Sequence, residues 1–145
     1  MSLPQKNAIH IWLIGAVALF INSIGGYDFI MTLSKNQDYF LSLSYNARQI
    51  EYFTNYPMLL AFFWFIGVWA AFAGSISILL RSRYSRILFL IAILGQIILD
   101  AYSFFFKHRW EVLGPRLGAQ DLIVLAFTIL LAIYSHYLIK RGFVK

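Results

Sequence analysis

PMLLAFFWFIGVWAAFAGSISILL, from Pro57 to Leu80, is the stretch that decides the fold of this chain. It carries no charged side chain, and it exceeds the ~20 residues that an α-helix needs to cross ~30 Å of hydrocarbon. The basic turn RSRYSR, residues 81–86, follows it directly, and arginines beside an apolar run are typical of a membrane surface. The segment therefore predicts a membrane-spanning helix that ends in a basic turn.

Three more apolar runs accompany this segment, and each approaches or exceeds the length of a span. Of the 145 residues, 61% are hydrophobic and 12% are charged, a composition that excludes a soluble globular domain and a disordered chain. We predict an all-α membrane protein, an antiparallel four-helix transmembrane bundle in which residues 1–145 form a single integral membrane domain. The expected spans are about 9–29, 57–80, 87–106 and 122–139.

The connecting segments alternate between two faces, and their charges are sorted. One face carries only basic residues, whereas the other carries basic and acidic residues in equal number. Because Lys and Arg near helix ends are retained in the cytoplasm during insertion, we predict that the basic face and both termini are cytoplasmic, in a bacterial inner membrane. The formal charge of +6 follows from this asymmetry, so no nucleic-acid partner is expected. The basic residues of this face are Lys6, Arg81, Arg83, Arg86, Lys140, Arg141 and Lys145.

Within the basic turn, Arg81, Arg83 and Arg86 are expected to meet anionic lipid headgroups, because each basic residue near such a surface contributes about 1 kcal/mol. The lipid bilayer is thus the first partner that the sequence predicts. The turn is short, so the helices on either side of it are expected to be neighbours.

The longest connection, residues 30–56, is expected to lie on the membrane surface. Ser44 is predicted to cap a short amphipathic interfacial helix whose apolar face holds Ala47, Ile50 and Phe53. The last connection, residues 107–121, contains Gly114-Pro115 and Gly118, which predict turns there and not a continuing helix.

Small and weakly polar residues recur at helical spacing along every span and predict the faces on which the helices pack. Small side chains let helix backbones approach each other closely where lipid supplies no hydrophobic drive, and polar ones bond across the interface. The four stripes are Gly15, Ala18, Asn22 and Gly26; Gly67, Ala71, Gly74 and Ser77 or Ile78; Ala92, Gln96, Asp100 and Ser103; and Thr128, Ala132 and Ser135.

Asp100 is the acidic residue that lies within the third apolar run, about 9 Å from its outer end by helical rise. An ionised Asp inside a span costs about 3 kcal/mol, so it is expected to face the bundle, find a partner or take a proton. Two interpretations stay open: a binding or proton-coupling site, and a carboxylate that only fixes helix packing. The expected site is an outward-opening polar and aromatic pocket, with one of Asn22 and Asp28 meeting Asp100. Its candidate residues are Asp100, Gln96, Asp28, Asn22, Tyr27, Trp64 and Tyr102.

The sequence predicts no enzymatic activity. It has no cysteine, no phosphate-binding glycine loop and no hydrolase motif. His10 and His136 lie near the same ends of the first and last spans, which leaves a haem or metal pair as a minor alternative to two interfacial side chains. We expect no catalytic residue, no cofactor and no metal site.

Several motifs in the first part of the chain are similar to those of a known group. They are GYDFIMT at residues 26–32, the aromatic approach to Pro57, the WFIGVW and GS motifs of residues 64–69 and 74–75, and LLRSR at residues 79–83. Together they resemble a group of uncharacterised small bacterial four-helix membrane proteins that are often loosely labelled sugar transporters. The resemblance draws attention to Tyr27, Asp28, Trp64, Trp69 and Arg81 but implies no role for them, and it does not extend to Asp100.

We therefore predict a small non-enzymatic membrane protein whose outward-facing pocket binds a small solute, a lipid or a partner helix. One alternative is a small transporter coupled to protons or to a solute. Another is an accessory subunit or scaffold, with a second copy of the chain or another membrane protein as its partner. No transporter-like repeat relates the two halves of the chain.

Overall fold

The computed structural model describes residues 9–144, and all regular structure in this range is helical. The termini with Lys6 and Lys145, which belong to the predicted charge sorting, lie outside the described residues. The helices are α1 (Ile9–Leu33), α2 (Gln37–Ser42), α3 (Ala47–Thr54), α4 (Met58–Leu79), α5 (Tyr84–Phe106) and α6 (Arg109–Lys140).

Four of these helices, α1, α4, α5 and α6, are long and apolar enough to cross a membrane, so the prediction of four apolar helices is confirmed. Three of them exceed their predicted spans. α1 continues to Leu33, α5 already begins at Tyr84 and α6 already begins at Arg109. The residues added to α5 and α6 are more polar than the apolar runs and reach past the hydrocarbon-length segment that hydropathy detects, whereas those added to α1 remain mostly apolar.

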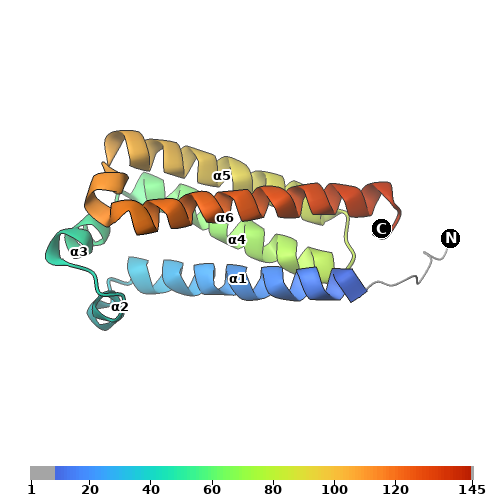
Figure 1. Ribbon diagram of the computed structural model, residues 1–145, viewed down its shortest axis with the longest axis horizontal. Helices are drawn as coiled ribbons and strands as arrows, with labels where there is room; N and C mark the ends of the chain where they lie inside the picture. Colours follow the sequence, from blue (N-terminus) through green and yellow to red (C-terminus); the bar gives the residue numbers. More distant parts are fainter. Residues whose placement is uncertain (1–8, 145) are drawn as a thin grey trace.

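The long helices are arranged so that α4 packs along α1 and α5, and α5 packs along α6 (Figure 1). The short helices α2 and α3 lie at one end of the bundle, which we call the α2–α3 end. At the opposite end lie the start of α1, the α4–α5 turn and the end of α6. The basic residues Arg81, Arg83, Arg86, Lys140 and Arg141 gather at this opposite end, where the described residues include no Asp or Glu.

The predicted small-residue stripes face the helix interfaces. All four residues of the α1 stripe and all three of the α6 stripe are buried, and buried members of the other two stripes include Ala71, Gly74, Ala92, Asp100 and Ser103. A Cβ atom on Gly74 would lie 2.9 Å from the Phe89 ring, and one on Gly15 would lie 2.6 Å from Leu79. The absence of these Cβ atoms is therefore what lets the helices approach each other.

The first connection differs from its prediction, because it forms two short helices and not one. α3 begins after Asn46, whose side chain accepts from the backbone of Gln49 while Gln49 bonds back in a capping box. The prediction that Ser44 caps this helix is wrong, since Ser44 adopts φ 61° in the turn before the cap. An N-cap residue needs an extended backbone, which Asn46 has at φ −80° and ψ 173°.

The last connection also differs from its prediction of turns. Only Lys107 and His108 separate α5 from α6, and residues 109–140 are helical except for a kink at Gly114, whose φ 87° and ψ 168° interrupt the helix. Pro115 restarts the helix at a position where no backbone donor is required. Gly118 lies inside the helix and is buried, with Trp110 folded back over it, so it marks close packing and not a turn.

The kink lets the first turn of α6 join α2 and α3 in a cap over the bundle. Phe40, Tyr52, Phe53 and Leu113 form the buried core of this cap. The Gln49 side-chain amide also donates to the Leu113 carbonyl at 3.2 Å, which satisfies an acceptor beside the interruption at Gly114.

Candidate functional site

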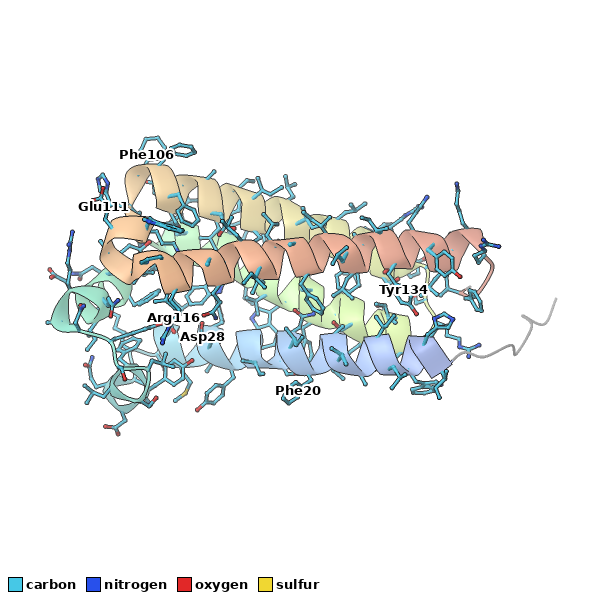
Figure 2. The ribbon with its side chains drawn as sticks, in the orientation of Figure 1. Phe20, Asp28, Phe106, Glu111, Arg116 and Tyr134 are labelled. Atoms are coloured by element: carbon cyan, nitrogen blue, oxygen red, sulfur yellow. The ribbon has the colours of Figure 1, made fainter. Side chains whose placement is uncertain are left out.

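A cavity of about 390 Å³ lies below this cap, among α1, α4, α5 and α6. Its lining reaches the middle of α1 at Ile21 and Asn22. Figure 2 shows Asp28 and Arg116 toward the α2–α3 end, whereas Phe20 and Phe106 project away from the bundle. The polar side chains that line the cavity are Asn22, Asp28, Tyr39, Tyr45, Tyr56, Gln96, Asp100, Arg109, Arg116, Gln120, Asp121 and Thr128.

Asp100 lines the cavity from α5 and is only 9% exposed. Its Oδ2 atom is buried and has no hydrogen-bond partner among the described residues. Gln96, one turn away along the same face of α5, donates through Nε2 to the Asp121 carbonyl at 3.2 Å. Asp100 Oδ2 is thus an acceptor held inside the bundle without a donor from residues 9–144.

Asn22 connects α1 to α4 at the deep part of the cavity. Its Nδ2 atom donates to Ser75 Oγ at 2.8 Å and to the Ala71 carbonyl at 3.3 Å. Such bonds between apolar helices each contribute about 0.6 kcal/mol and fix the register of the pair. Asn22 therefore has a packing role in addition to its place in the lining.

Asp28 lines the cavity from α1, and hydroxyl groups satisfy its carboxylate. The Tyr39 hydroxyl donates to Asp28 Oδ1 at 2.5 Å, and the Thr32 hydroxyl donates to the same atom at 3.4 Å. Burial and the neighbouring carboxylate raise the pKa of Tyr39 well above its usual value, so its hydroxyl keeps the proton that it donates. The bond from Tyr39 to Asp28 joins α2 to α1.

Arg109 and Asp121 form an ion pair on the cavity wall across the Gly114 kink. Two nitrogens of the guanidinium, Nε and Nη2, donate to the two oxygens of the carboxylate. Their side chains are only 15% and 20% exposed, and the guanidinium also lies 5.9 Å from the centre of the Phe53 ring. The pair therefore joins both parts of α6 to the aromatic cap.

An aromatic wall completes the cavity. Phe53, Tyr56, Phe63 and Trp64 line it, and the Tyr56 and Trp64 ring centres are 5.6 Å apart. Burial raises the pKa of Tyr45 to about 12 and that of Tyr56 further, so both hydroxyls are neutral at physiological pH. Charged, amide, hydroxyl and aromatic groups thus converge on one space, an arrangement suited to holding a small polar molecule.

Of the seven residues expected to line the pocket, five do: Asn22, Asp28, Trp64, Gln96 and Asp100. The expectation that one of Asn22 and Asp28 meets Asp100 is not met: both line the cavity, but Asn22 bonds to Ser75 and Ala71, and Asp28 accepts from Tyr39 and Thr32. The two residues are six positions, or about 9 Å, apart along α1, so the cavity extends along the helix and does not sit at a single level.

Tyr27 and Tyr102 do not close the cavity as expected. Their side chains are 56% and 41% exposed on the outer surface of the bundle, and neither lines the cavity. Tyr27 stacks edge-on against Tyr39, and Tyr102 packs against Phe106. Tyr39, Tyr45 and Tyr56 from the first connection occupy the place that the prediction gave to Tyr27 and Tyr102.

Sequence reasoning missed Arg109, Arg116, Gln120 and Asp121 because it predicted turns in residues 107–121 and not a kinked helix. The available signal was the pair of opposite charges on either side of Gly114-Pro115. A kink between two helical segments lets such charges approach each other.

His10 and His136, the pair that the sequence left as an alternative, contact different partners. His10 Nδ1 lies 2.7 Å from the Tyr134 hydroxyl, and His136 Nδ1 lies 3.1 Å from Arg86. Within residues 9–144, no group of three or more His, Asp or Glu side chains is placed to hold a metal ion. Arg86, expected at the lipid surface, thus also contacts α6, while Arg83 is exposed.

Comparisons of the chain with protein-family models, with curated protein sequences and with solved structures found no match. The chemistry of the cavity is therefore the basis for any assignment of function.

Proposed function

We propose that this chain is a small integral membrane protein that binds a small solute in the cavity beneath the cap and catalyses no reaction on it. The observation that carries the proposal is the presence of Asp100, Gln96 and the Arg109–Asp121 pair around one space between apolar helices. Each charged group placed within a span costs several kcal/mol unless it is paired or hydrated. Such groups are retained where they bind something that lipid cannot replace.

We further propose an antiparallel bundle with both ends in the cytoplasm of a bacterium and with the cavity on the outer side of the inner membrane. The charge distribution supports this orientation. The end with Arg81, Arg83 and Arg86 carries no acidic residue among residues 9–144, whereas Asp28, Asp38 and the other acidic residues lie toward the α2–α3 end. The cap and its cavity are at that second end.

The experiment is thermal unfolding of the purified full chain in lipid nanodiscs with a panel of sugars, amino acids, amines and carboxylates. A ligand at 100 times its Kd stabilises the folded state by about 2.7 kcal/mol. We expect at least one compound to raise the Tm, and we expect Gly25→Leu to abolish the rise. Gly25 lines the cavity, and a Cβ atom there would have no neighbour within 4 Å, so the new side chain has room to occupy the space.

Ala16→Leu is the matched control, because Ala16 is exposed on the same helix and lies outside the cavity lining. It should leave the response to the solute unchanged. A panel with no effect, or a response that survives Gly25→Leu, contradicts solute binding in the cavity. Stoichiometric copurification of another membrane protein together with that result would favour a scaffold.

Transport is the second candidate, favoured by the asymmetry of the bundle. The half opposite the α2–α3 end is filled by a core that includes Ile11, Ile78, Phe89 and Leu138, so the cavity lies in one half of the bundle. We propose that it opens toward the α2–α3 end, since one state of an alternating-access cycle requires a site open to one side. Accumulation of the bound solute inside proteoliposomes, lost in Gly25→Leu, is the expected result; binding without movement of solute contradicts transport.

A further inference from the structure

We infer that the ligand of the cavity carries a protonated amine, with Asp100 as its counter-ion and Trp64 beside it. The inference rests on the proposed function and names the chemical class of the solute. It starts from a comparison of the three carboxylates that line the cavity.

Two of these carboxylates have protein partners. Asp28 accepts from Tyr39 and Thr32, and Asp121 is paired with Arg109. Asp100 accepts no hydrogen bond through Oδ2 from any of residues 9–144, although it is only 9% exposed. Of the three carboxylates, Asp100 is thus the one to which a ligand can supply a missing hydrogen-bond donor.

Arg116, which also lines the cavity, is exposed at the α2–α3 end, where water can solvate its charge. Its guanidinium therefore needs no anion from a ligand. A buried carboxylate differs, because taking an unpaired charge out of water costs several kcal/mol. A ligand of opposite charge therefore gains more binding free energy by pairing with Asp100 than by pairing with Arg116.

Trp64 lies at the level of Asp100. The α4 backbone meets α5 where a Cβ atom on Gly67 would contact the Gln96 backbone nitrogen at 3.6 Å. From that contact, Trp64 is three residues and Asp100 four residues toward the α2–α3 end, since α4 begins and α5 ends there. At about 1.5 Å of rise per residue, the two differ in level by roughly 2 Å.

A carboxylate and an indole ring that line one cavity from similar backbone levels favour an ammonium group as the ligand. The N–H groups of a protonated amine can donate to Asp100, and its charge is attracted to the face of an indole ring when it lies within ~6 Å. A neutral polyol can donate to the carboxylate but leaves its charge unbalanced in a site of low dielectric. Discrimination between a cation and a neutral analogue of the same shape should therefore be large.

Benzylamine and benzyl alcohol provide the test, because they have the same shape and differ in charge at neutral pH. Binding of each to the full chain in nanodiscs is measured by calorimetry. We expect benzylamine to bind at least about tenfold more tightly than benzyl alcohol, a difference of about 1.4 kcal/mol. Asp100→Asn should remove this preference, whereas Asp38→Asn, an exposed change outside the cavity lining, should retain it.

Equal affinity for the two probes, or a benzylamine preference that survives Asp100→Asn, overturns the inference. The proposed function then still stands if any compound of the solute panel binds in a manner that Gly25→Leu abolishes. If no compound does, the inference and the proposed function fail together.

A second measurement does not require the Asp100 variant to fold. The chain has no cysteine, so Val68→Cys places a single thiol in the cavity lining and Ser44→Cys places one on the exposed cap. At each position the reaction rates of a cationic and an anionic methanethiosulfonate are measured. We expect the ratio of the cationic rate to the anionic rate to be several-fold higher at position 68 than at position 44. An equal or inverted ratio at position 68 overturns the inference.

Discussion

Arg109 and Asp121 are twelve residues apart in α6, yet their side chains form a two-point ion pair. In a straight helix their backbones would be separated by about 18 Å along the axis. They meet because Gly114 leaves the helical conformation between them, at φ 87° and ψ 168°. The pair and the kink therefore depend on each other, and together they hold the first turn of α6 against the cap.

Removing one partner of this pair should destabilise the fold strongly. We expect Asp121→Asn to lower the free energy of unfolding by about 3 kcal/mol, because Arg109 is left with an unpaired charge in a largely buried site. The double variant Arg109→Gln with Asp121→Asn should lose less unfolding free energy than the sum of the losses of the two single variants. Reversible unfolding in mixed detergent micelles measures both.

Glu111→Gln is the control for that experiment. The Glu111 carboxylate lies 4.0 Å from His108 in a pair whose side chains are 72% and 68% exposed, so its loss should change stability by no more than about 0.5 kcal/mol. A cost at Asp121 as small as at Glu111 would contradict the role assigned to the pair.

Gly114 and Gly25 should respond in opposite ways to the same substitution. A Cβ atom at either position has no neighbour within 4 Å, so only backbone conformation distinguishes them. Gly114 has backbone angles that are reserved for glycine, so Gly114→Ala should lower the free energy of unfolding by about 1–3 kcal/mol. Gly25 lies inside helix α1, so Gly25→Ala should raise the free energy of unfolding by up to about 1 kcal/mol. Thermal unfolding of both variants checks the signs; a stabilising Gly114→Ala would show that the kink is not required.

The bond between Asn22 and Ser75 should contribute modestly to the packing of α1 on α4. We expect Asn22→Ala to cost about 1 kcal/mol and to be coupled to Ser75→Ala by about 0.6 kcal/mol in a double-mutant cycle. Ser23→Ala, an exposed neighbour on the same helix, should be neutral. Strict additivity of the two buried changes would contradict a direct bond.

Stability should fall at alkaline pH because buried tyrosines retain their protons. Burial raises the pKa of Tyr45 to about 12 from its usual 10.0. Below pH 10 both the folded and the unfolded chain hold this proton; between pH 10 and about 12 only the folded protein does, so the free energy of unfolding decreases as pH rises.

Thermal unfolding across that pH range checks this prediction. Tyr45→Phe should reduce the loss of stability with pH, and Tyr84→Phe, an exposed change at the opposite end of the bundle, should not. An identical pH dependence in the wild type and the Tyr45→Phe variant would contradict the raised pKa.

Helical periodicity was enough to predict the long helices and their packing faces. Residues spaced three or four apart, such as Gly15 and Ala18 on α1, share a helix face wherever the helix is placed, so their burial could be predicted without knowing its neighbour. Asp100 was found in the same way, because a carboxylate inside an apolar run is costly unless it faces the bundle.

The rest of the cavity depends on one backbone conformation that local pattern does not determine. Gly-Pro usually ends a helix, and here Gly114 kinks one whose two parts then fold together. Turns in residues 107–121 would leave Arg109 and Asp121 apart at the surface, so their ion pair does not follow from the sequence. The contact of Tyr39 with Asp28 likewise could not be predicted, since it depends on how α2 folds back over α1.

The central claim is that a polar cavity within the membrane-embedded bundle is open to the outer solution. Reaction of Val68→Cys and Leu94→Cys with a membrane-impermeant thiol reagent, added outside intact cells, tests it most directly, with Ser44→Cys as the exposed reference. Val68 lines the cavity, whereas Leu94 is 61% exposed on the surface of α5 that the proposal assigns to lipid. We predict that the thiol at position 68 reacts and the one at position 94 does not. Reaction at position 94 together with protection at position 68 would contradict the account.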